Sequence, residues 1–182
     1  MTRTIAVYGS ARLLPDDPVY QQTYAVGRAL AQTGYVVMTG GYGGVMAAAS
    51  QGAAEAGGHV IGVTVGQRLT AEKEVNPWVK EEIYYDKLDD RLAHLVERAD
   101  GYVVMPGGIG TLQEITEAWT ALRIHIVPPR PFVFYGYFWR PIFDLLAQSP
   151  YISPTDSAMI HFVQDIDAML DYLAQWYAQE KA

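Results

Sequence analysis

The sequence predicts an α/β protein with a Rossmann-like, doubly wound parallel sheet and helices on both faces, formed by residues 1–182 as a single domain. Two observations predict this fold. Short apolar runs rich in valine and isoleucine alternate with helical periods, as in parallel sheets that are covered on both sides. A chain of 182 residues, 50% hydrophobic and 18% charged, also has the size and composition of one globular domain.

In the first half of the chain, each apolar run is followed by a turn signal or a helical period. Gly34 follows the first helical period as a C-terminal cap, and Gly57 with Gly58 stops the second, which is rich in alanine and suits close packing on a sheet. We expect a strand at 4–8, a helix at 21–32, a strand at 35–38, a helix at 45–56, a strand at 59–64 and a short strand at 83–85. Residues 66–79 are charged and loop-like, and we expect them to form a mobile rim over a site.

The second half continues the alternation. We expect a helix at 86–99, a strand at 102–105, a helix at 111–126, a strand at 132–135, a helix at 140–148, a strand at 160–163 and a helix at 165–177. The last helix carries an apolar stripe that should dock on the body of the protein, made of Ile166, Met169, Leu170, Leu173, Trp176 and Tyr177.

Composition excludes several classes of site and partner. The chain has no cysteine, so disulfides, thiolate zinc sites and cysteine nucleophiles are excluded, and no pair of its histidines has metal-ligand spacing. A net charge of −7 without a basic stripe argues against a nucleic-acid partner. No apolar run approaches the roughly 18 residues of a membrane span, and no signal-peptide pattern opens the chain, so we expect a cytoplasmic protein with no membrane partner.

Glycine or serine follows three of the expected strands, and ligands of doubly wound sheets bind outside the carboxyl ends of the strands. Glycine leaves room for a ligand at the backbone, and the N–H groups that start the next helix favour a phosphate. The alternative is that these glycines only make tight turns. Neither turn has the lysine of a Walker loop or the spacing of a dinucleotide fingerprint, so a mononucleotide or sugar phosphate is favoured over NAD. The residues concerned are Gly9, Ser10, Gly40, Gly41, Gly43, Gly44, Gly107, Gly108, Gly110 and Thr111.

An acid and an arginine stand near these turns. Glu114 lies at the edge of the apolar face of its helix, one turn from the anion-binding end, where it could act on a ligand or stabilise the first turn through the helix dipole. Arg91 lies closest to the buried face of the helix at 86–99. It could clamp a phosphate or hold a carboxylate, or it could belong to a surface stripe paired with Asp90 or Glu97.

The stretch "PGGIGTLQE" resembles the PGGxGTxxE motif of the LONELY GUY (LOG) family, long mislabelled as lysine decarboxylases. The resemblance runs from Ile5 to about Leu146 and includes "VYGSA", "GGYGGVM" and "GAAEAGGHVIGV". It implies a Rossmann-like homodimer that hydrolyses the N-glycosidic bond of nucleoside 5′-monophosphates, such as cytokinin ribotides and AMP, to free base and ribose 5-phosphate. No metal or organic cofactor is implied.

The resemblance also assigns roles to residues of this chain. Arg91 and Glu114 fall where the family has its catalytic pair. Thr111 and the second glycine turn would hold the phosphate, through Gly107, Gly108 and Gly110. The first turn and the first strand end would line the pocket, through Ser10, Gly40, Gly41 and Gly44. For the implied dimer, we expect the apolar faces of the helices at 86–99 and 111–126 to pair across a two-fold axis.

A second hypothesis comes from positions where the chain departs from the usual family pattern. Leu92, Thr39 and Ala47 replace a common lysine and two glycines, Ala11 replaces a serine, and "VPPR" lengthens a loop. Thr39 together with "GVMAAASQGA" resembles relatives that include a molybdenum-cofactor carrier protein. The alternative function is therefore a non-catalytic carrier or sensor of a nucleotide or an anionic pterin.

Overall fold

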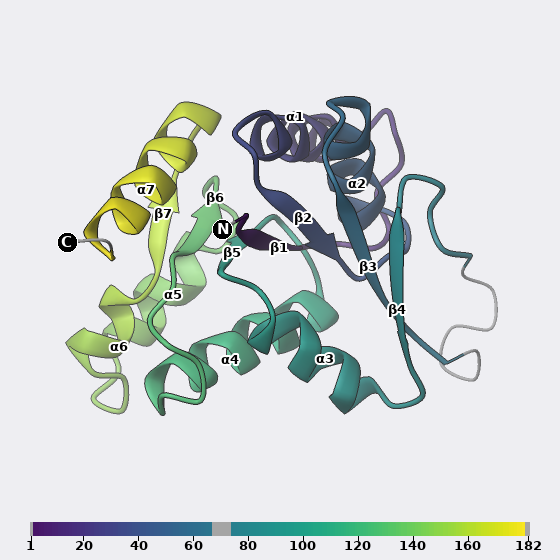
Figure 1. The fold of residues 1–182 in the computed structure, drawn as a ribbon. Helices are drawn as coiled ribbons and strands as arrows, with labels where there is room; N and C mark the ends of the chain where they lie inside the picture. Colours follow the sequence, from purple (N-terminus) through teal and green to yellow (C-terminus); the bar gives the residue numbers. More distant parts are fainter. Residues whose placement is uncertain (1, 67–73, 181–182) are drawn as a thin grey trace.

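The computed structural model describes residues 2–66 and 74–180, which form a layer of parallel strands between two layers of helices (Figure 1). The strands are β1 (Thr4–Tyr8), β2 (Val36–Thr39), β3 (Val60–Val65), β4 (Glu81–Tyr85), β5 (Gly101–Val104), β6 (Phe132–Tyr135) and β7 (His161–Val163). They form one sheet in the order β4-β3-β2-β1-β5-β6-β7, and every pairing given by the described residues is parallel. The doubly wound parallel fold is thus confirmed.

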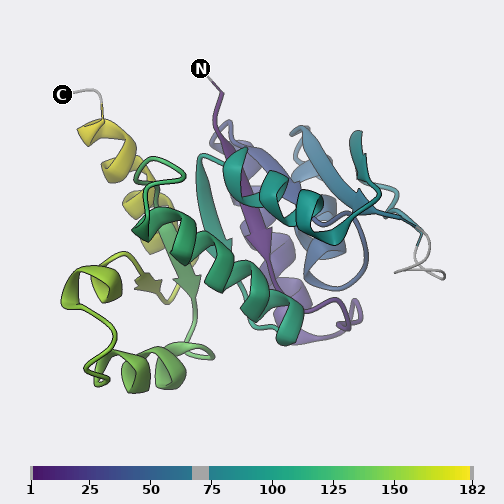
Figure 2. The same cartoon turned by 90° about the horizontal axis from the view of Figure 1, so that it is seen from below.

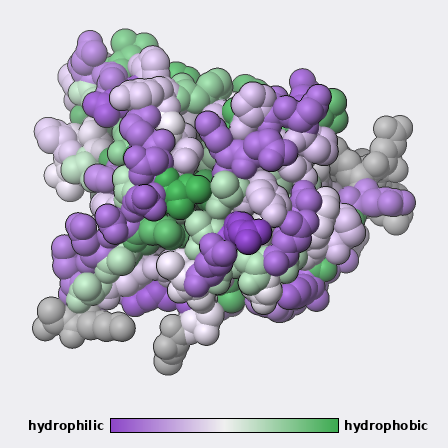
Figure 3. Space-filling model, turned by 90° about the horizontal axis from the view of Figure 1, so that it is seen from above, coloured by the Kyte–Doolittle hydropathy of each residue, from purple (hydrophilic) through white to green (hydrophobic). Residues whose placement is uncertain are grey.

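Helices cover both faces of this sheet. One layer holds α1 (Pro18–Gln32), α2 (Val45–Glu55) and α7 (Ile166–Gln179), and the other holds α3 (Leu88–Glu97), α4 (Ile109–Arg123), α5 (Arg140–Ala147) and the short α6 (Pro154–Ala158) (Figures 1 and 2). Seen from outside, the first layer is largely hydrophilic, with a small hydrophobic area near the centre of the view (Figure 3). The helices therefore direct most of their apolar residues at the sheet.

Alternate residues of the central strand, β1, pack into two separate cores. Ala6 and Tyr8 of β1 pack in the core that α3, α4 and α5 cover. Ile5 and Val7 pack in the core beneath α1, α2 and α7. Because both faces of the strand are buried, its sequence is continuously apolar rather than alternating. The predicted stripe of α7 docks in the second core, through Met169, Leu173 and Tyr177, with Ile166, Leu170 and Trp176 packed around them.

Local signals explain where the elements differ from expectation. Helix α1 begins at Pro18, earlier than predicted, because the Asp17 side chain caps the Val19 N–H and proline suits the first turn. Helix α6 was not predicted. Ser153 and Asp156 form a reciprocal capping box that starts it. Strand β4 begins at Glu81 rather than residue 83, since this edge strand is partly exposed and lacks a hydrophobic run.

The order of the strands creates a crevice between β1 and β5. After β1 the chain moves outward through β2, β3 and β4, and α3 then carries it back to β5 on the other side of β1. Connections therefore leave these two neighbours in opposite directions, which is the switch point where doubly wound sheets bind ligands. Backbone bonds tie the two strand ends together, from Met105 N–H to the Tyr8 carbonyl at 2.8 Å and from Ser10 N–H to the Pro106 carbonyl at 3.0 Å.

Candidate active site

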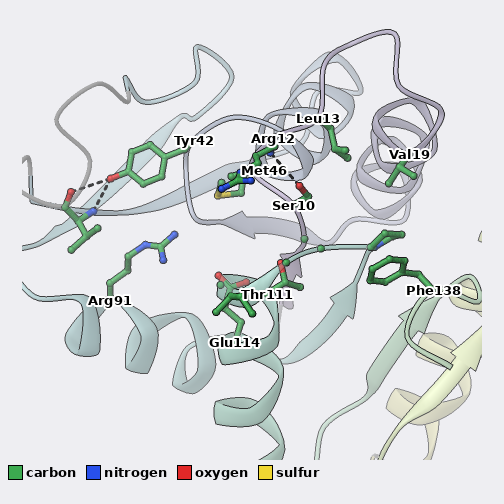
Figure 4. Close-up of a pocket in the computed structure, with 18 of the residues that line it drawn as sticks. Ser10, Arg12, Leu13, Val19, Tyr42, Met46, Arg91, Thr111, Glu114 and Phe138 are labelled. Carbon is green, nitrogen blue, oxygen red and sulfur yellow. Dashed lines mark hydrogen bonds between the residues drawn. The ribbon is translucent and has the colours of Figure 1, made fainter. Parts of the chain in front are cut away.

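A cavity of about 860 Å³ opens at this switch point, and both expected functional side chains line it. Figure 4 shows Ser10 and Thr111 near its middle, Glu114 below them, Arg91 and Tyr42 to one side and Phe138 to the other. These residues come from segments that are far apart in the sequence. A cavity of this size is large enough for a small-molecule ligand.

The floor of the cavity holds an uncapped helix N-terminus. Gly108 is the N-cap of α4 and supplies no side chain to the first turn. Within residues 2–66 and 74–180, no group accepts a hydrogen bond from the N–H of Ile109, Gly110 or Thr111. Such free donors at the positive end of a helix favour an anion.

The glycines of this second turn are required for different reasons. A Cβ on Gly107 would lie 2.2 Å from Oγ1 of Thr111, so the packing of that threonine demands glycine. A Cβ on Gly108 or Gly110 would meet no atom within 4 Å, and neither residue has a positive φ. The described protein atoms therefore do not explain glycine at these two positions, whereas a ligand close to the backbone would.

Ser10 adds a hydroxyl to the same region. Its backbone is engaged on both sides, because its N–H donates to Pro106 and its carbonyl accepts from Val45 N–H at 2.8 Å. The Oγ accepts from Arg12 N–H at 3.2 Å, which leaves the hydroxyl proton able to donate to a ligand. Arg12 itself is exposed and contributes a cation to the cavity lining.

Glu114 lies one turn into α4 and reaches the cavity from the edge of the buried face. Burial raises the pKa of its carboxyl group to about 7, against the opposing effect of the positive charge on Arg91. The carboxyl group consequently gains or loses its proton near neutral pH, as a general base or acid must.

Arg91 is held by backbone oxygens rather than by an acid. The residue is only 8% exposed, and its Nε donates to the Val63 carbonyl at 2.7 Å while Nη2 donates to the Gly40 carbonyl at 3.3 Å. No carboxylate in the described part of the chain forms an ion pair with it. The alternative of a surface stripe paired with Asp90 or Glu97 is therefore wrong.

Arg91 and Glu114 approach the cavity from neighbouring helices, α3 and α4, without forming an ion pair with each other. Both side chains lie at the cavity wall (Figure 4). Their charges still interact, because Arg91 lowers the pKa of Glu114. The space between them is open to a ligand or to water.

The first glycine turn does not behave as expected. Gly40, Gly41 and Gly44 are absent from the lining of the described cavity. Gly44 has a φ of 64° and lies against the Ser10 backbone, where a Cβ would be 2.1 Å from the carbonyl oxygen. That same carbonyl accepts the N–H of Val45, the first residue of α2, so one of the donors at this helix start is satisfied by protein. The glycines of this turn therefore lie behind the cavity wall, and Tyr42 is the residue of the turn that lines the cavity.

Several residues that line the cavity were not predicted from the sequence. Tyr42 sits inside the first glycine turn, Met46 is the second residue of α2, Leu13 lies in the β1–α1 connection, Val19 is the second residue of α1, and Phe138 follows β6. Apart from the position of Tyr42 between four glycines, no sequence signal singles them out. Of the expected rim at 66–79, residues 67–73 lie outside the described part, whereas Asn76 is buried and bonded to the first glycine turn.

Two departures from the family pattern have a structural explanation. The Thr39 hydroxyl lies 3.2 Å from the Ser50 hydroxyl and accepts from Gly41 N–H at 3.1 Å, so threonine satisfies buried polar groups beside the turn. Leu92 is buried and does not line the cavity. Arg130, from the "VPPR" insertion, donates to the carbonyl groups of Val96, Glu97 and Ala99 at the end of α3.

The apolar faces of α3 and α4 are already occupied. Leu95 and Val96 of α3 and Ile115 and Ala118 of α4 pack against the sheet. These four residues are used within the protomer, so pairing of α3 and α4 across a two-fold axis would have to use other side chains of the two helices, and that pairing stays a prediction.

The described residues offer neither a metal site of three or more side-chain ligands nor a membrane-spanning helix. Among them, no group of three or more His, Asp or Glu side chains could hold a metal ion. No helix in the same ranges is long and apolar enough to cross a membrane.

Comparisons with known proteins give the chain a family. A family model described as "Possible lysine decarboxylase" matches residues 46–173. The chain is 31% identical over 180 residues to the cytokinin riboside 5′-monophosphate phosphoribohydrolase of Mycobacterium marinum, a match covering 94% of this chain and 93% of that protein. A probable enzyme of the same name from Oryza sativa subsp. japonica is 29% identical, and the match covers 78% of this chain but only 63% of the rice protein.

Among solved structures, the molybdenum cofactor binding protein from Rippkaea orientalis has the same fold, with a TM-score of 0.77, 22% sequence identity and coverage of 97% of this chain and 98% of that one. The family model spans more than half of the present chain, and the mycobacterial match spans nearly all of it. The chain therefore belongs to the LONELY GUY family, whose relatives are named phosphoribohydrolases and whose model still carries the lysine decarboxylase description.

Proposed function

We propose that this protein is a nucleoside 5′-monophosphate phosphoribohydrolase, which releases the free base and ribose 5-phosphate from AMP or a cytokinin ribotide. One observation carries the proposal: an uncapped helix N-terminus, Glu114 and Arg91 all face one cavity. The name of the Mycobacterium marinum relative, a phosphoribohydrolase that matches nearly the whole length of this chain, supports the reaction.

The phosphate would bind first, at the N-terminus of α4. Backbone N–H groups of residues 109–111 and the hydroxyls of Thr111 and Ser10 can donate to its oxygens, and Arg12 adds a positive charge at the wall. This remote anchor would fix the ribose beside Glu114, one helical turn away. Binding energy from a group that does not react is then used to orient the bond that does.

Hydrolysis breaks the bond between C1′ and the base nitrogen. The bonding electrons leave with the base, which takes up a proton, while positive charge develops on the ribose. An ionised Glu114 would stabilise that charge and accept a proton from the water whose oxygen bonds to C1′. Arg91 would help to keep Glu114 ionised and would orient the substrate or the carboxylate, since its charge is not taken up by an acid in the described residues.

The decisive test is product formation by the purified protein. Incubation with AMP and with an N6-substituted AMP should release base and ribose 5-phosphate in equal amounts, measured by chromatography. Glu114→Gln should abolish release, whereas Glu117→Gln, an exposed position one turn further on the same helix, should not. No release from any nucleotide at high protein concentration would reject the proposal, and full activity of Glu114→Gln would reject the assigned role.

A second candidate is a carrier or sensor that binds a nucleotide or an anionic pterin without cleaving it. It is favoured by the similarity in fold to a molybdenum cofactor binding protein along 97% of this chain, and by Leu92 in place of the usual lysine. Calorimetry with the molybdenum cofactor and with AMP separates the two. Tight binding of the pterin with no turnover of nucleotides would favour the carrier.

The family resemblance further supports a homodimer. The surfaces available for it include apolar side chains left exposed on the described chain, namely Ile109, Ile124, Ile126, Ile142 and Leu145. Light scattering at micromolar concentration should give twice the mass of the 20.2 kDa chain, and a monomer would contradict the assembly.

A further inference from the structure

The first glycine turn, whose glycines do not line the cavity, is in contact with Arg91. A Cβ on Gly40 would lie 1.9 Å from Nη2 of Arg91, so the guanidinium occupies the space that any other residue at 40 would fill. The same guanidinium donates to the carbonyl of Gly40 on one side and to the carbonyl of Val63 on the other. The ends of β2 and β3 thus form a slot for the arginine.

Tyr42 closes this slot. Its ring centroid lies 6.0 Å from Cζ of Arg91, within reach of a cation–π attraction. Its hydroxyl donates to the Val65 carbonyl at 3.0 Å and accepts from the Val65 N–H at 2.9 Å, and the tyrosine is 5% exposed. Because the buried Tyr42 hydroxyl both donates and accepts a hydrogen bond, the position of its ring is fixed.

Asn76 holds the turn from the outside. Its backbone N–H donates to the Gly41 carbonyl at 2.8 Å and its side-chain amide donates to the Tyr42 carbonyl at 3.1 Å. Residues on both sides of the turn therefore restrain the tyrosine.

We propose that Tyr42 is a positioning residue for Arg91, and that the first glycine turn orients this arginine instead of binding phosphate. This inference deepens the proposed function. Its kinetic test rests on that function, whereas its exchange test does not. Arg91 has carbonyl partners but no carboxylate partner in residues 2–66 and 74–180, so its direction depends on the slot and on the ring that closes it.

The first test needs no substrate. The Nε–H of Arg91 is buried and hydrogen-bonded to Val63, so its exchange with solvent should be slow and measurable by 1H–15N NMR. Tyr42→Phe removes the two hydroxyl bonds to Val65 but keeps the ring, and we expect roughly 10-fold faster exchange of this proton, because local opening becomes easier. Tyr42→Leu, which also removes the ring, should increase it further.

The second test is kinetic and uses a matched control. A loosened arginine should lower kcat for AMP by roughly 10-fold in Tyr42→Phe with KM changed little, since misplacement of a catalytic group affects mainly the chemical step. Tyr177→Phe is the control: this tyrosine is also buried, its hydroxyl donates to the Asp100 carbonyl at 2.9 Å, and it lies on α7, away from α3 and from the cavity lining. The control variant should leave Arg91 exchange and kcat unchanged even if the melting temperature falls.

The outcomes distinguish failure of the proposed function from failure of the inference about Tyr42. If the wild-type protein releases no base, the proposed function fails and the exchange measurement alone decides the inference. Unchanged Arg91 exchange in Tyr42→Phe overturns it, whatever happens to kcat. Equal effects of Tyr42→Phe and of the control Tyr177→Phe also overturn it, because the change in exchange would then reflect a general loosening of the protein. Gly40→Ala, if it folds, should resemble or exceed Tyr42→Leu.

Discussion

Nη2 of Arg91 donates to the carbonyl oxygen of Gly40 at 3.3 Å, and the absent side chain of Gly40 provides the space in which that nitrogen lies. An arginine held by carbonyl oxygens keeps its full positive charge, whereas one paired with a carboxylate is neutralised locally. The charge of Arg91 is therefore available to the cavity and to Glu114. This relationship determines how the site should respond to pH and to substitution.

Activity should depend on the ionisation of Glu114. With a pKa of about 7, the carboxylate fraction rises about tenfold between pH 6 and pH 8, and kcat/KM for AMP should follow it. Arg91→Met removes the charge that lowers this pKa, so the rising limb should move to higher pH in the variant. Ionisation of the substrate phosphate is the same for both proteins, so an identical limb in the two profiles would show that Glu114 is not the group observed.

Stability should change with pH through the same carboxyl group. The folded pKa of Glu114 is raised, so the folded state binds the proton more tightly, and stability is lost as pH rises from about 4.5 to about 7. Glu114→Gln avoids this loss and should be more stable than the wild type at pH 8, by at most about 3 kcal/mol after screening by solvent in the open cavity. Urea unfolding at pH 4 and pH 8 measures it. An advantage of equal size at both pH values would contradict the shifted pKa.

Substitution of two neighbouring glycines should separate ligand binding from folding. Gly110→Ala meets no protein atom, so its unfolding free energy should stay the same or rise by up to about 1 kcal/mol, while affinity for AMP should fall. Gly107→Ala places a Cβ against Thr111 and should destabilise the protein itself by roughly 1–3 kcal/mol. Thermal melts and calorimetry on both variants check this. Unchanged AMP affinity in Gly110→Ala would place the phosphate elsewhere.

Removal of Arg130 should weaken the helix that carries Arg91. Its guanidinium donates to carbonyl groups at the end of α3, where a positive charge also complements the helix dipole. Arg130→Met should lower the unfolding free energy by roughly 1–3 kcal/mol, because buried carbonyls lose their donor. The exposed Arg28 serves as a control, since Arg28→Met should change stability by less than about 0.5 kcal/mol. Equal losses would mean that the contacts of Arg130 contribute nothing specific.

Much of the fold could be predicted because both faces of the sheet are covered. Runs such as Phe132–Tyr135 are buried on all sides, so their apolar character is unmistakable. The capping box of α6 was a visible signal, but a helix of five residues has too little periodicity to be recognised. Strand β4 was shortened in the prediction because Glu81 and Glu82 face solvent at the sheet edge.

The site was harder to predict than the fold. Glu114 and Arg91 could be selected as candidates because each sits at a defined angle on a helix, Glu114 one turn after the second glycine turn and Arg91 closest to the buried face of its helix. Tyr42 and Phe138 lie in connections, where side-chain direction follows from tertiary contacts and not from periodicity. The two glycine turns look alike in sequence, yet in the described residues the first N–H of α4 has no acceptor, whereas the first N–H of α2 donates to the Ser10 carbonyl, a contact between distant segments.

The hydrogen bond from the Val45 N–H to the Ser10 carbonyl, together with the bond between Ser10 and Pro106, has a consequence for the kinetics of folding. The two sides of the cavity come from chain segments almost a hundred residues apart, and β2, β3, β4 and α3 lie between them in the chain. Closure of such a long loop costs conformational entropy, so we expect it late in folding. Helical content should therefore recover earlier than ligand binding during refolding, and a phosphorylated ligand would stabilise the completed native state without guiding the steps that precede it.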